Sequence, residues 1–262
     1  LYFPGQSARI EYFTEGVSIV ENELRDGSEA QFTVTIEVPV TEDVSVKGEL
    51  NLDPSISGKA KIKKYSLDYL EFNFDIEEQL DLTTEVTVAS LELEEEITLA
   101  KITFPTITVM MGPVPVVLTP VFTLKIGVNI GVSSTLSTGI TQDLKIKTSV
   151  MYEYETWSTD YKLEKGFGYL PPELSNTAEA KAYVQPQLAI KVYGIVSPNV
   201  STQLYGLLEA EHGADPWWSL YAGLRGDIGV KVKVWIITVA NFSANVFDLK
   251  YLIAEASPLT DE

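Results

Sequence analysis

The residues that usually carry enzyme chemistry are scarce in this chain. It has one histidine and no cysteine, so a Ser-His-Asp triad would depend on His212 and a cysteine nucleophile is excluded. His212 lies in residues 209–216, where Gly, Asp and Pro residues predict a turn between strands. We therefore predict no catalytic residue and expect a protein that is not an enzyme.

The same inventory argues against metal and nucleotide sites. One histidine without cysteine cannot form a structural zinc site, and no D-x-D-x-D-G calcium loop or glycine-rich phosphate loop occurs. We predict no metal site and no cofactor. Paired carboxylates that hydrolyse glycosides stay an alternative, because the chain has 37 acidic residues and the separation of such a pair depends on the fold.

Aromatic residues in the second half of the chain offer binding chemistry, since their rings can stack on sugar rings. Trp217 and Trp218 are adjacent at the predicted start of a strand, so their side chains must point to opposite faces. Trp218 shares its face with Leu220 and is predicted to be buried. Trp217 and Tyr221 flank Ser219 on the other face, and we expect this pair to contact a glycan or a surface or matrix protein.

Two further aromatic residues complete the candidate ligand-binding set. Trp157 and Tyr161 follow the central strands of the chain and could join Trp217 and Tyr221 in one platform. Packing of the same rings against the core is the alternative interpretation, and it is the commoner use of aromatic residues.

A proline-rich apolar segment offers a different kind of site. Residues 104–115 contain three prolines among hydrophobic residues, which predicts an extended, buried crossing segment. If the sheets enclose a cavity, this segment and the strand after it would line it and bind an apolar, lipid-like ligand. The predicted lining residues are Met110, Met111, Phe122 and Leu124.

The charge balance excludes several classes of partner. Nineteen basic and 37 acidic residues give 19 − 37 = −18, and a surface this acidic repels nucleic acid and anionic membranes. No run of 18 apolar residues occurs, so no transmembrane helix is predicted. Without cysteine, stability must come from packing and backbone hydrogen bonds.

The elements that position these residues are predicted by a strict alternation of apolar and polar residues. Between residues 114 and 154 the apolar residues recur at every second position, which is the period of a strand. A Ser-, Thr- and Gly-rich turn at residues 133–139 predicts that two long strands pair here as a hairpin. The even-numbered residues of the first strand should face a core, namely Phe122, Leu124, Ile126, Val128 and Ile130.

The same alternation through most of the chain predicts the fold class. We expect an all-β protein with large antiparallel sheets and long hairpins, in a sandwich or flattened barrel, with essentially no helix. Three local breaks are predicted: a turn at residues 53–55, a bulge or bend at residues 63–64, and a turn or polyproline-like stretch at residues 169–172.

The domain organisation is predicted to be simple. Residues 1–6 resemble the remnant of an expression tag and are left out of the fold prediction. Residues 7–262 should form one large β domain. Two tightly joined lobes, residues 7–104 and 105–256, followed by a short C-terminal tail, are the alternative.

Four stretches of the second half resemble a known family. They are residues 169–172 (YLPP), 180–188 (AKAYVQPQL), 193–198 (YGIVSP) and 215–224 (DPWWSLYAGL). Together they are similar to a largely uncharacterised β-rich domain of secreted and cell-surface prokaryotic proteins, often found beside Ig-like modules, and the resemblance covers roughly residues 114–256. It implies an extracellular or cell-surface location and brings no catalytic residues with it.

The sequence thus predicts a non-catalytic extracellular β module of a cell-surface or secreted protein, with a structural or adhesive role. Two alternatives stay open. One is a carrier of an apolar ligand in a β cavity. The other is an outer-membrane β-barrel, which would also show long alternating strands.

Overall fold

A computed structural model describes residues 9–23, 30–63, 66–111, 114–154, 156–193, 196–234 and 237–256 of the 262-residue chain. These residues form fourteen β-strands and no helix, which confirms the all-β prediction. Within the same ranges, no helix has the length and hydropathy needed to span a membrane.

The larger sheet, sheet A, has eight antiparallel strands in the order β1-β6-β8-β11-β12-β13-β14, with β7 paired to β8. It combines strands from both halves of the chain. Its strands are β1 (Arg9–Tyr12), β6 (Leu91–Thr103), β7 (Ile107–Met111), β8 (Val114–Val132), β11 (Ala178–Val192), β12 (Val196–Ala210), β13 (Trp218–Val234) and β14 (Ile237–Glu255).

The second sheet, sheet B, has six antiparallel strands in the order β10-β9-β5-β4-β3-β2. It likewise joins early and late segments, because β9 lies beside β5. Its strands are β2 (Val17–Glu23), β3 (Ala30–Pro39), β4 (Val44–Lys63), β5 (Ser66–Val86), β9 (Leu136–Glu153) and β10 (Thr156–Glu173).

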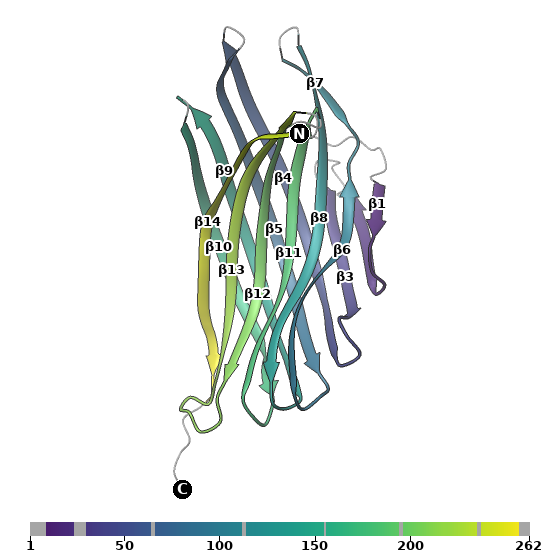
Figure 1. The fold of residues 1–262 in the computed structure, drawn as a ribbon, viewed down its shortest axis with the longest axis vertical. Coiled ribbons are helices and arrows are strands. Elements are labelled where there is room, and N and C mark those ends of the chain that lie inside the picture. Colours follow the sequence, from purple (N-terminus) through teal and green to yellow (C-terminus); the bar gives the residue numbers. More distant parts are fainter. Residues whose placement is uncertain are drawn as a thin grey trace.

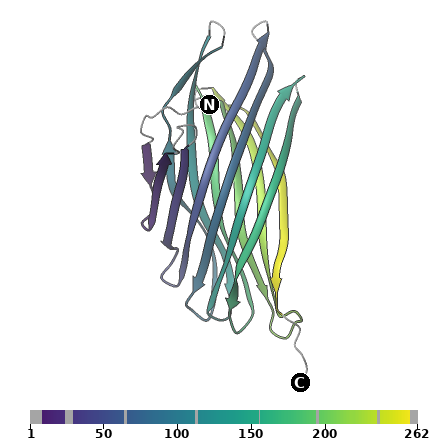
Figure 2. The same ribbon diagram turned by 180° about the vertical axis from the view of Figure 1, so that it is seen from behind.

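The two sheets lie face to face, with their strands along the longest axis of the molecule. Sheet A is in front in Figure 1 and sheet B is in front in Figure 2. They form a sandwich and are not closed into a barrel. On one side the edge strands β10 and β14 meet through aromatic side chains: Tyr161 packs on Phe247 and Phe167 on Tyr251, with ring centroids 4.9 and 5.5 Å apart.

The core follows from the alternation in each strand, because every second side chain points between the sheets. The even-numbered residues of β8 belong to one cluster of buried side chains drawn from both sheets. Their predicted facing is confirmed, since none is more than 2 % exposed: Phe122, Leu124, Ile126, Val128 and Ile130.

The predicted hairpin within residues 114–154 is wrong. β8 pairs with β6, β7 and β11, whereas β9 pairs with β5 and β10. The chain crosses from sheet A to sheet B at residues 133–135, where the Ser133 amide donates to the Thr177 carbonyl at 3.0 Å. Alternation predicts which residues face the core but not which strand lies alongside, so it does not distinguish a hairpin from an arch between sheets.

Two predicted turns are in fact strand. Residues 53–55 continue β4: in the described structure this strand pairs only with β5 beyond Leu52, so it tolerates Pro54, which has no amide hydrogen to donate. Residues 169–172 continue β10, an edge strand that accepts prolines for the same reason, with a shift of register after Leu170.

The predicted bulge or bend at residues 63–64 falls partly outside the described residues, which include Lys63 but not Lys64. β4 stops at Lys63, which pairs with Ser66 at the start of β5. The interruption in the apolar pattern therefore separates two paired strands. A register shift does occur nearby, after Lys61.

One edge of sheet A is covered over only part of its length. In the described part of the chain, β1 pairs with residues 100–103 of β6, and the first half of β6 has β8 as its one neighbouring strand. Glu95 in this half is opposite the buried Val128, so it lies on the inner side of the sheet between Leu93 and Ile97, and it is exposed. The open edge thus carries a charge on its inward side.

Replacing Ile126 by aspartate should lower the free energy of unfolding by about 4 kcal/mol, because it places an unpaired charge in the core. Asn129→Asp is the matched control, since Asn129 is exposed on the outer face of the same strand. Urea denaturation followed by tryptophan fluorescence measures both. Equal stability of Ile126→Asp and the parent would contradict the facing of β8.

Candidate functional site

Two tyrosines lie flat on the outer face of sheet A, each over a glycine of a neighbouring strand. A Cβ atom added at Gly127 would overlap the ring of Tyr183, and one added at Gly223 would overlap the ring of Tyr205. Only glycine leaves room for these rings, and the rings cover the bare backbone. The row of paired residues that contains them crosses six strands: Glu96, Gly127, Tyr183, Tyr205, Gly223 and Lys250.

Tyr183 reaches across Gly127 to β6. Its hydroxyl donates to Glu96 Oε2 at 3.0 Å, and Lys125 Nζ lies 2.6 Å from Glu96 Oε1. Burial, together with this hydrogen bond, raises the pKa of Tyr183 to about 12. The hydrogen bond from Lys125 lowers the pKa of Glu96. The tyrosine therefore stays protonated and donates to an ionised carboxylate at neutral pH.

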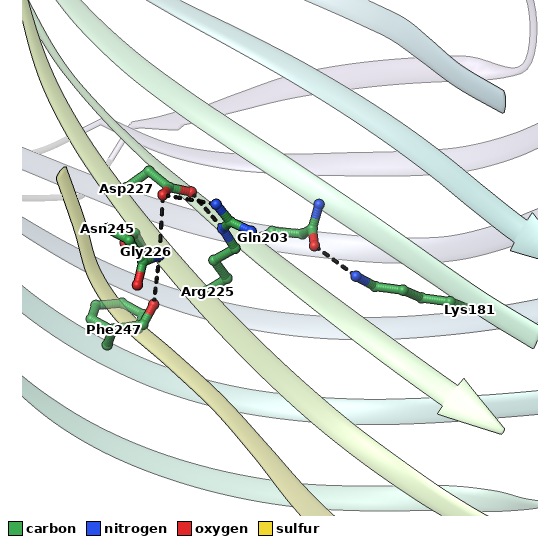
Figure 3. A network of polar contacts seen from close by, with 7 residues as sticks. All are labelled: Lys181, Gln203, Arg225, Gly226, Asp227, Asn245 and Phe247. Atoms are coloured by element: carbon green, nitrogen blue, oxygen red, sulfur yellow. Dashed lines mark hydrogen bonds and ion pairs between the residues drawn. The ribbon is translucent and has the colours of Figure 1, made fainter. Parts of the chain in front are cut away.

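Lys181 covers the two rings from solvent. Its ammonium group lies 4.2 Å from the ring centroid of Tyr205 and 5.6 Å from that of Tyr183. It also donates to Gln203 Oε1 at 3.0 Å, as Figure 3 shows. Burial lowers the pKa of Lys181. Because Lys181 lies over the rings and Tyr205 is only 7 % exposed, the two tyrosines pack on the sheet and do not offer an open platform for a sugar.

The rest of the network in Figure 3 repairs a break in the β13–β14 ladder. The register shifts between Gly226 and Asp227. Asn245 Nδ2 donates to the carbonyls of Gly226 and Phe247, both at 3.2 Å, and to Asp227 Oδ1 at 3.1 Å. Asp227 also accepts from Arg225 at 3.1 and 3.4 Å. The Asn245 amide thus donates hydrogen bonds to backbone carbonyls where the register shifts, which is a structural role.

A groove of about 860 Å³ opens at the end of sheet A, beside the loop that joins β12 to β13. Its walls come from the ends of β6, β8, β11 and β12 and from that loop. Glutamates from four of these elements line it: Glu92, Glu179, Glu209 and Glu211.

Three of the glutamates lie in one row across the sheet. Glu92 is opposite Gly131, Gly131 is opposite Glu179, and Glu179 is opposite Glu209. Like charges on adjacent strands repel, so this arrangement costs stability. Lys250 offsets part of the repulsion, since its Nζ lies 2.7 Å from Glu209 Oε1. Gly131 adds no side chain, which leaves the floor of the groove open.

The loop between β12 and β13 forms the remaining wall. The Glu211 amide donates to the Trp217 carbonyl at 2.9 Å, and the His212 amide donates to Thr177 Oγ1 at 3.4 Å. His212 is exposed in a turn, as predicted. Trp217 is half-buried and lines the groove together with His212. An indole and several carboxylates therefore face the same space.

Trp218 and Tyr221 take the faces that alternation predicts for them. Trp218 is opposite Ala210 and packs against the core, but it is half-buried and not fully buried as predicted. Tyr221 lies on the outer face, where Lys250 Nζ is 3.8 Å from its ring centroid. Because Lys250 also contacts Glu209, Tyr221 is joined to the wall of the groove that contains Trp217.

Trp157 and Tyr161 do not join this site. Both are on β10 in sheet B. The ring of Trp157 packs against Tyr152 at 5.1 Å, and Tyr161 packs against Phe247. The four predicted aromatic residues therefore divide into a groove pair in sheet A and a packing pair at the β10 side of the sandwich.

The residues predicted to line a cavity lie elsewhere. Phe122 and Leu124 are packed in the core, 2 % and 0 % exposed. Met110 and Met111 belong to β7, which pairs with β8, and their side chains lie outside the described residues. In the predicted buried segment, Phe104 is buried and Thr106 and Thr108 are exposed, while residues 112 and 113 lie outside the described residues.

A small void lies between the sheets. It has a volume of about 20 Å³ and is lined by residues that include Thr138, Ile140 and Gly206. This is room for one water molecule and too little for a lipid chain.

Sequence reasoning missed the glutamates of the groove. Glu92, Glu179 and Glu209 come from three distant segments of the chain, and each is the outward-facing residue nearest a strand end. Their positions next to strand ends are visible in the sequence. Their proximity is not, because it depends on the order and register of β6, β8, β11 and β12.

Comparisons with protein-family models, with curated proteins and with solved structures give no match for this chain. Over the described ranges, no group of three or more His, Cys, Asp or Glu side chains is arranged to hold a metal ion. What the groove binds must therefore be inferred from its own side chains.

Gly127→Ala should lower the free energy of unfolding by about 1–3 kcal/mol, because the added methyl group displaces the Tyr183 ring and breaks its hydrogen bond to Glu96. Gly131→Ala is the control on the same strand, since its nearest non-local atom would be 3.9 Å away. Thermal denaturation compares them. Equal losses for both variants would show that the ring contact is unimportant.

Trp218→Ala should destabilise the protein by about 3 kcal/mol because it empties a site at the edge of the core. Trp217→Ala should leave the melting temperature nearly unchanged, since that side chain lines an open groove. Differential scanning calorimetry gives both values. The opposite order of the two losses would mean that the facing of β13 is reversed.

Proposed function

We propose that this chain is a non-catalytic binding module of a secreted or cell-surface protein, with a structural or adhesive role. In this proposal a glycan, or a surface or matrix protein, binds in the groove beside Trp217. The observation that carries the proposal is the indole of Trp217 at the wall of a groove lined by carboxylates. An indole offers a flat apolar surface to a sugar ring, and carboxylate oxygens accept hydrogen bonds from sugar hydroxyls.

The body of the molecule supports a module of this kind. Its core is one cluster that spans both sheets, and its net charge of −18 favours solubility outside a membrane. The volume of about 20 Å³ between the sheets beside Gly206, and the burial of Phe122 and Leu124, favour a module over a carrier of an apolar ligand. The resemblance noted for residues 114–256 agrees with an extracellular location.

A glycan array and a panel of immobilised matrix proteins test the proposal. The purified protein should bind at least one class of ligand, and Trp217→Ala should weaken that binding tenfold or more, which corresponds to about 1.4 kcal/mol. Tyr169→Ala is the matched control, because Tyr169 is 45 % exposed on β10, away from the groove.

Three outcomes would count against the proposal. Absence of binding to every glycan and matrix protein would remove it. Equal binding by the parent and Trp217→Ala would move the site away from the groove. Release of shorter sugars from a bound glycan would favour a glycosidase that uses a pair of the groove carboxylates.

A further inference from the structure

One buried acid takes no part in the features described above. Glu78 lies on the inner face of β5, between Leu52 of β4 and Leu144 of β9, and is 2 % exposed. Neither of its carboxyl oxygens has a hydrogen-bond partner in the described structure. Among side chains that are described, it is the only buried Asp, Glu, Lys or Arg. Burial of a polar group without a partner is costly, so a partner is expected.

The surroundings of Glu78 favour its neutral form. Its row neighbours Leu52 and Leu144 are apolar, and the described inward-facing residues of β8, β11 and β12 include no ionisable group. Two ionisable residues lie further along the row: Glu21 of β2, whose side chain lies outside the described residues, and Lys165 of β10. The Lys165 ammonium lies 3.0 Å from the ring centroid of Tyr251. Burial raises the pKa of Glu78 from 4.5 to about 8. A protonated carboxyl group has one hydrogen to donate.

Gln142 also has a buried polar atom without a described partner, and this atom is an acceptor. It is 1 % exposed, and its Nε2 donates to the backbone carbonyl of Tyr205 in sheet A at 3.2 Å, while its Oε1 has no partner in the described structure. Gln142 precedes Leu144 by two positions on β9, so it projects from the same face, diagonal to Glu78. Diagonal neighbours on adjacent strands are within reach of each other when their side chains are long.

We propose that the protonated carboxyl group of Glu78 donates a hydrogen bond to Gln142 Oε1. Glu78, Gln142 and the Tyr205 carbonyl then form a continuous polar bridge between the two sheets. Ionisation of Glu78 removes the donated proton and leaves two acceptors facing each other, so the bridge opens at alkaline pH. The polar bridge between the two sheets is therefore intact at neutral and acidic pH.

The pH dependence follows from the direction of the pKa shift. The unfolded chain releases the Glu78 proton near pH 4.5, whereas the folded protein keeps it until about pH 8. The contribution of Glu78 to stability is therefore complete below pH 4.5 and falls as the pH rises towards 8. The ratio of folded to unfolded molecules should fall by about tenfold per pH unit in this window and change no further above it.

Urea denaturation of the parent and of Glu78→Gln between pH 5.5 and 9 tests the titration. Glutamine has a similar volume, keeps a donor for Gln142 Oε1 and does not ionise. The folded-to-unfolded ratio of Glu78→Gln, divided by that of the parent, should therefore rise by about tenfold per pH unit up to pH 8. Glu77→Gln is the matched control, because Glu77 is the adjacent residue, exposed and 3.0 Å from Lys145. Parallel pH curves for the parent and Glu78→Gln would overturn the proposal.

Gln142→Leu separates the bridge from burial alone. A hydrogen bond accepted by Gln142 stabilises the protonated form of Glu78, so its loss should lower the pKa of Glu78 in the folded protein and lower the upper limit of the window of pH-dependent stability. An unchanged or raised pKa would show that Gln142 does not accept the proton.

Infrared spectroscopy tests the hydrogen bond of the protonated Glu78 directly, and it does not depend on the folding of Gln142→Leu. The parent at pH 6.5 should show the C=O stretching band of a hydrogen-bonded, protonated carboxyl group, and Glu78→Gln should lack it. The absence of such a band in the parent, or a frequency typical of a free carboxyl group, would contradict the bridge.

Discussion

The close approach of the two sheets at Gly206 is the constraint on which the rest of the sandwich depends. A Cβ atom added at Gly206 would lie 3.1 Å from the Ile140 side chain of the opposite sheet. Ala180 and Ala182 face the same region, and Gln142 donates to the Tyr205 backbone at this level. The small residues of sheet A thus let the Ile140 and Gln142 side chains of sheet B approach the backbone of sheet A. A larger residue at position 206 would push the two sheets apart.

The same constraint shapes the outer face of sheet A. At the level of Ala180, Ala182 and Gly206, the small inward residues bury little apolar surface. On the outer face, Tyr183 and Tyr205 add packing by covering Gly127 and Gly223. Glycines therefore serve both faces: Gly206 admits the opposite sheet, and the other two admit aromatic rings. The rings of Tyr183 and Tyr205 are thus in contact with glycine backbone on one side and with Lys181 on the other.

Much of the fold could be predicted from the sequence, because alternation reports the facing of each residue directly. It predicts the core side of β8 and the opposite faces of Trp217 and Trp218. Strand order is different. Whether β9 follows β8 in the same sheet depends on competition between distant partners, which one strand's pattern does not encode. The groove was missed for this reason, since its glutamates meet only through register.

Prolines misled the prediction because their effect depends on neighbours that the sequence does not reveal. Pro54 and the prolines of β10 would break a central strand, yet each lies where one side of the strand has no described partner to lose.

The inward-facing Glu95 on the open half of β6 bears on how the protein behaves at high concentration. The backbone of an unpaired strand edge can pair with a strand of another chain. The partly buried Leu93 and Ile97 offer apolar contacts to such a strand. Any strand that docked would have to bury the Glu95 carboxylate against its own inner residues, and the adjacent Glu94 and Glu96 would repel a second copy of the same edge. In the described part of the chain, these glutamates therefore disfavour the addition of a further strand at this edge of sheet A.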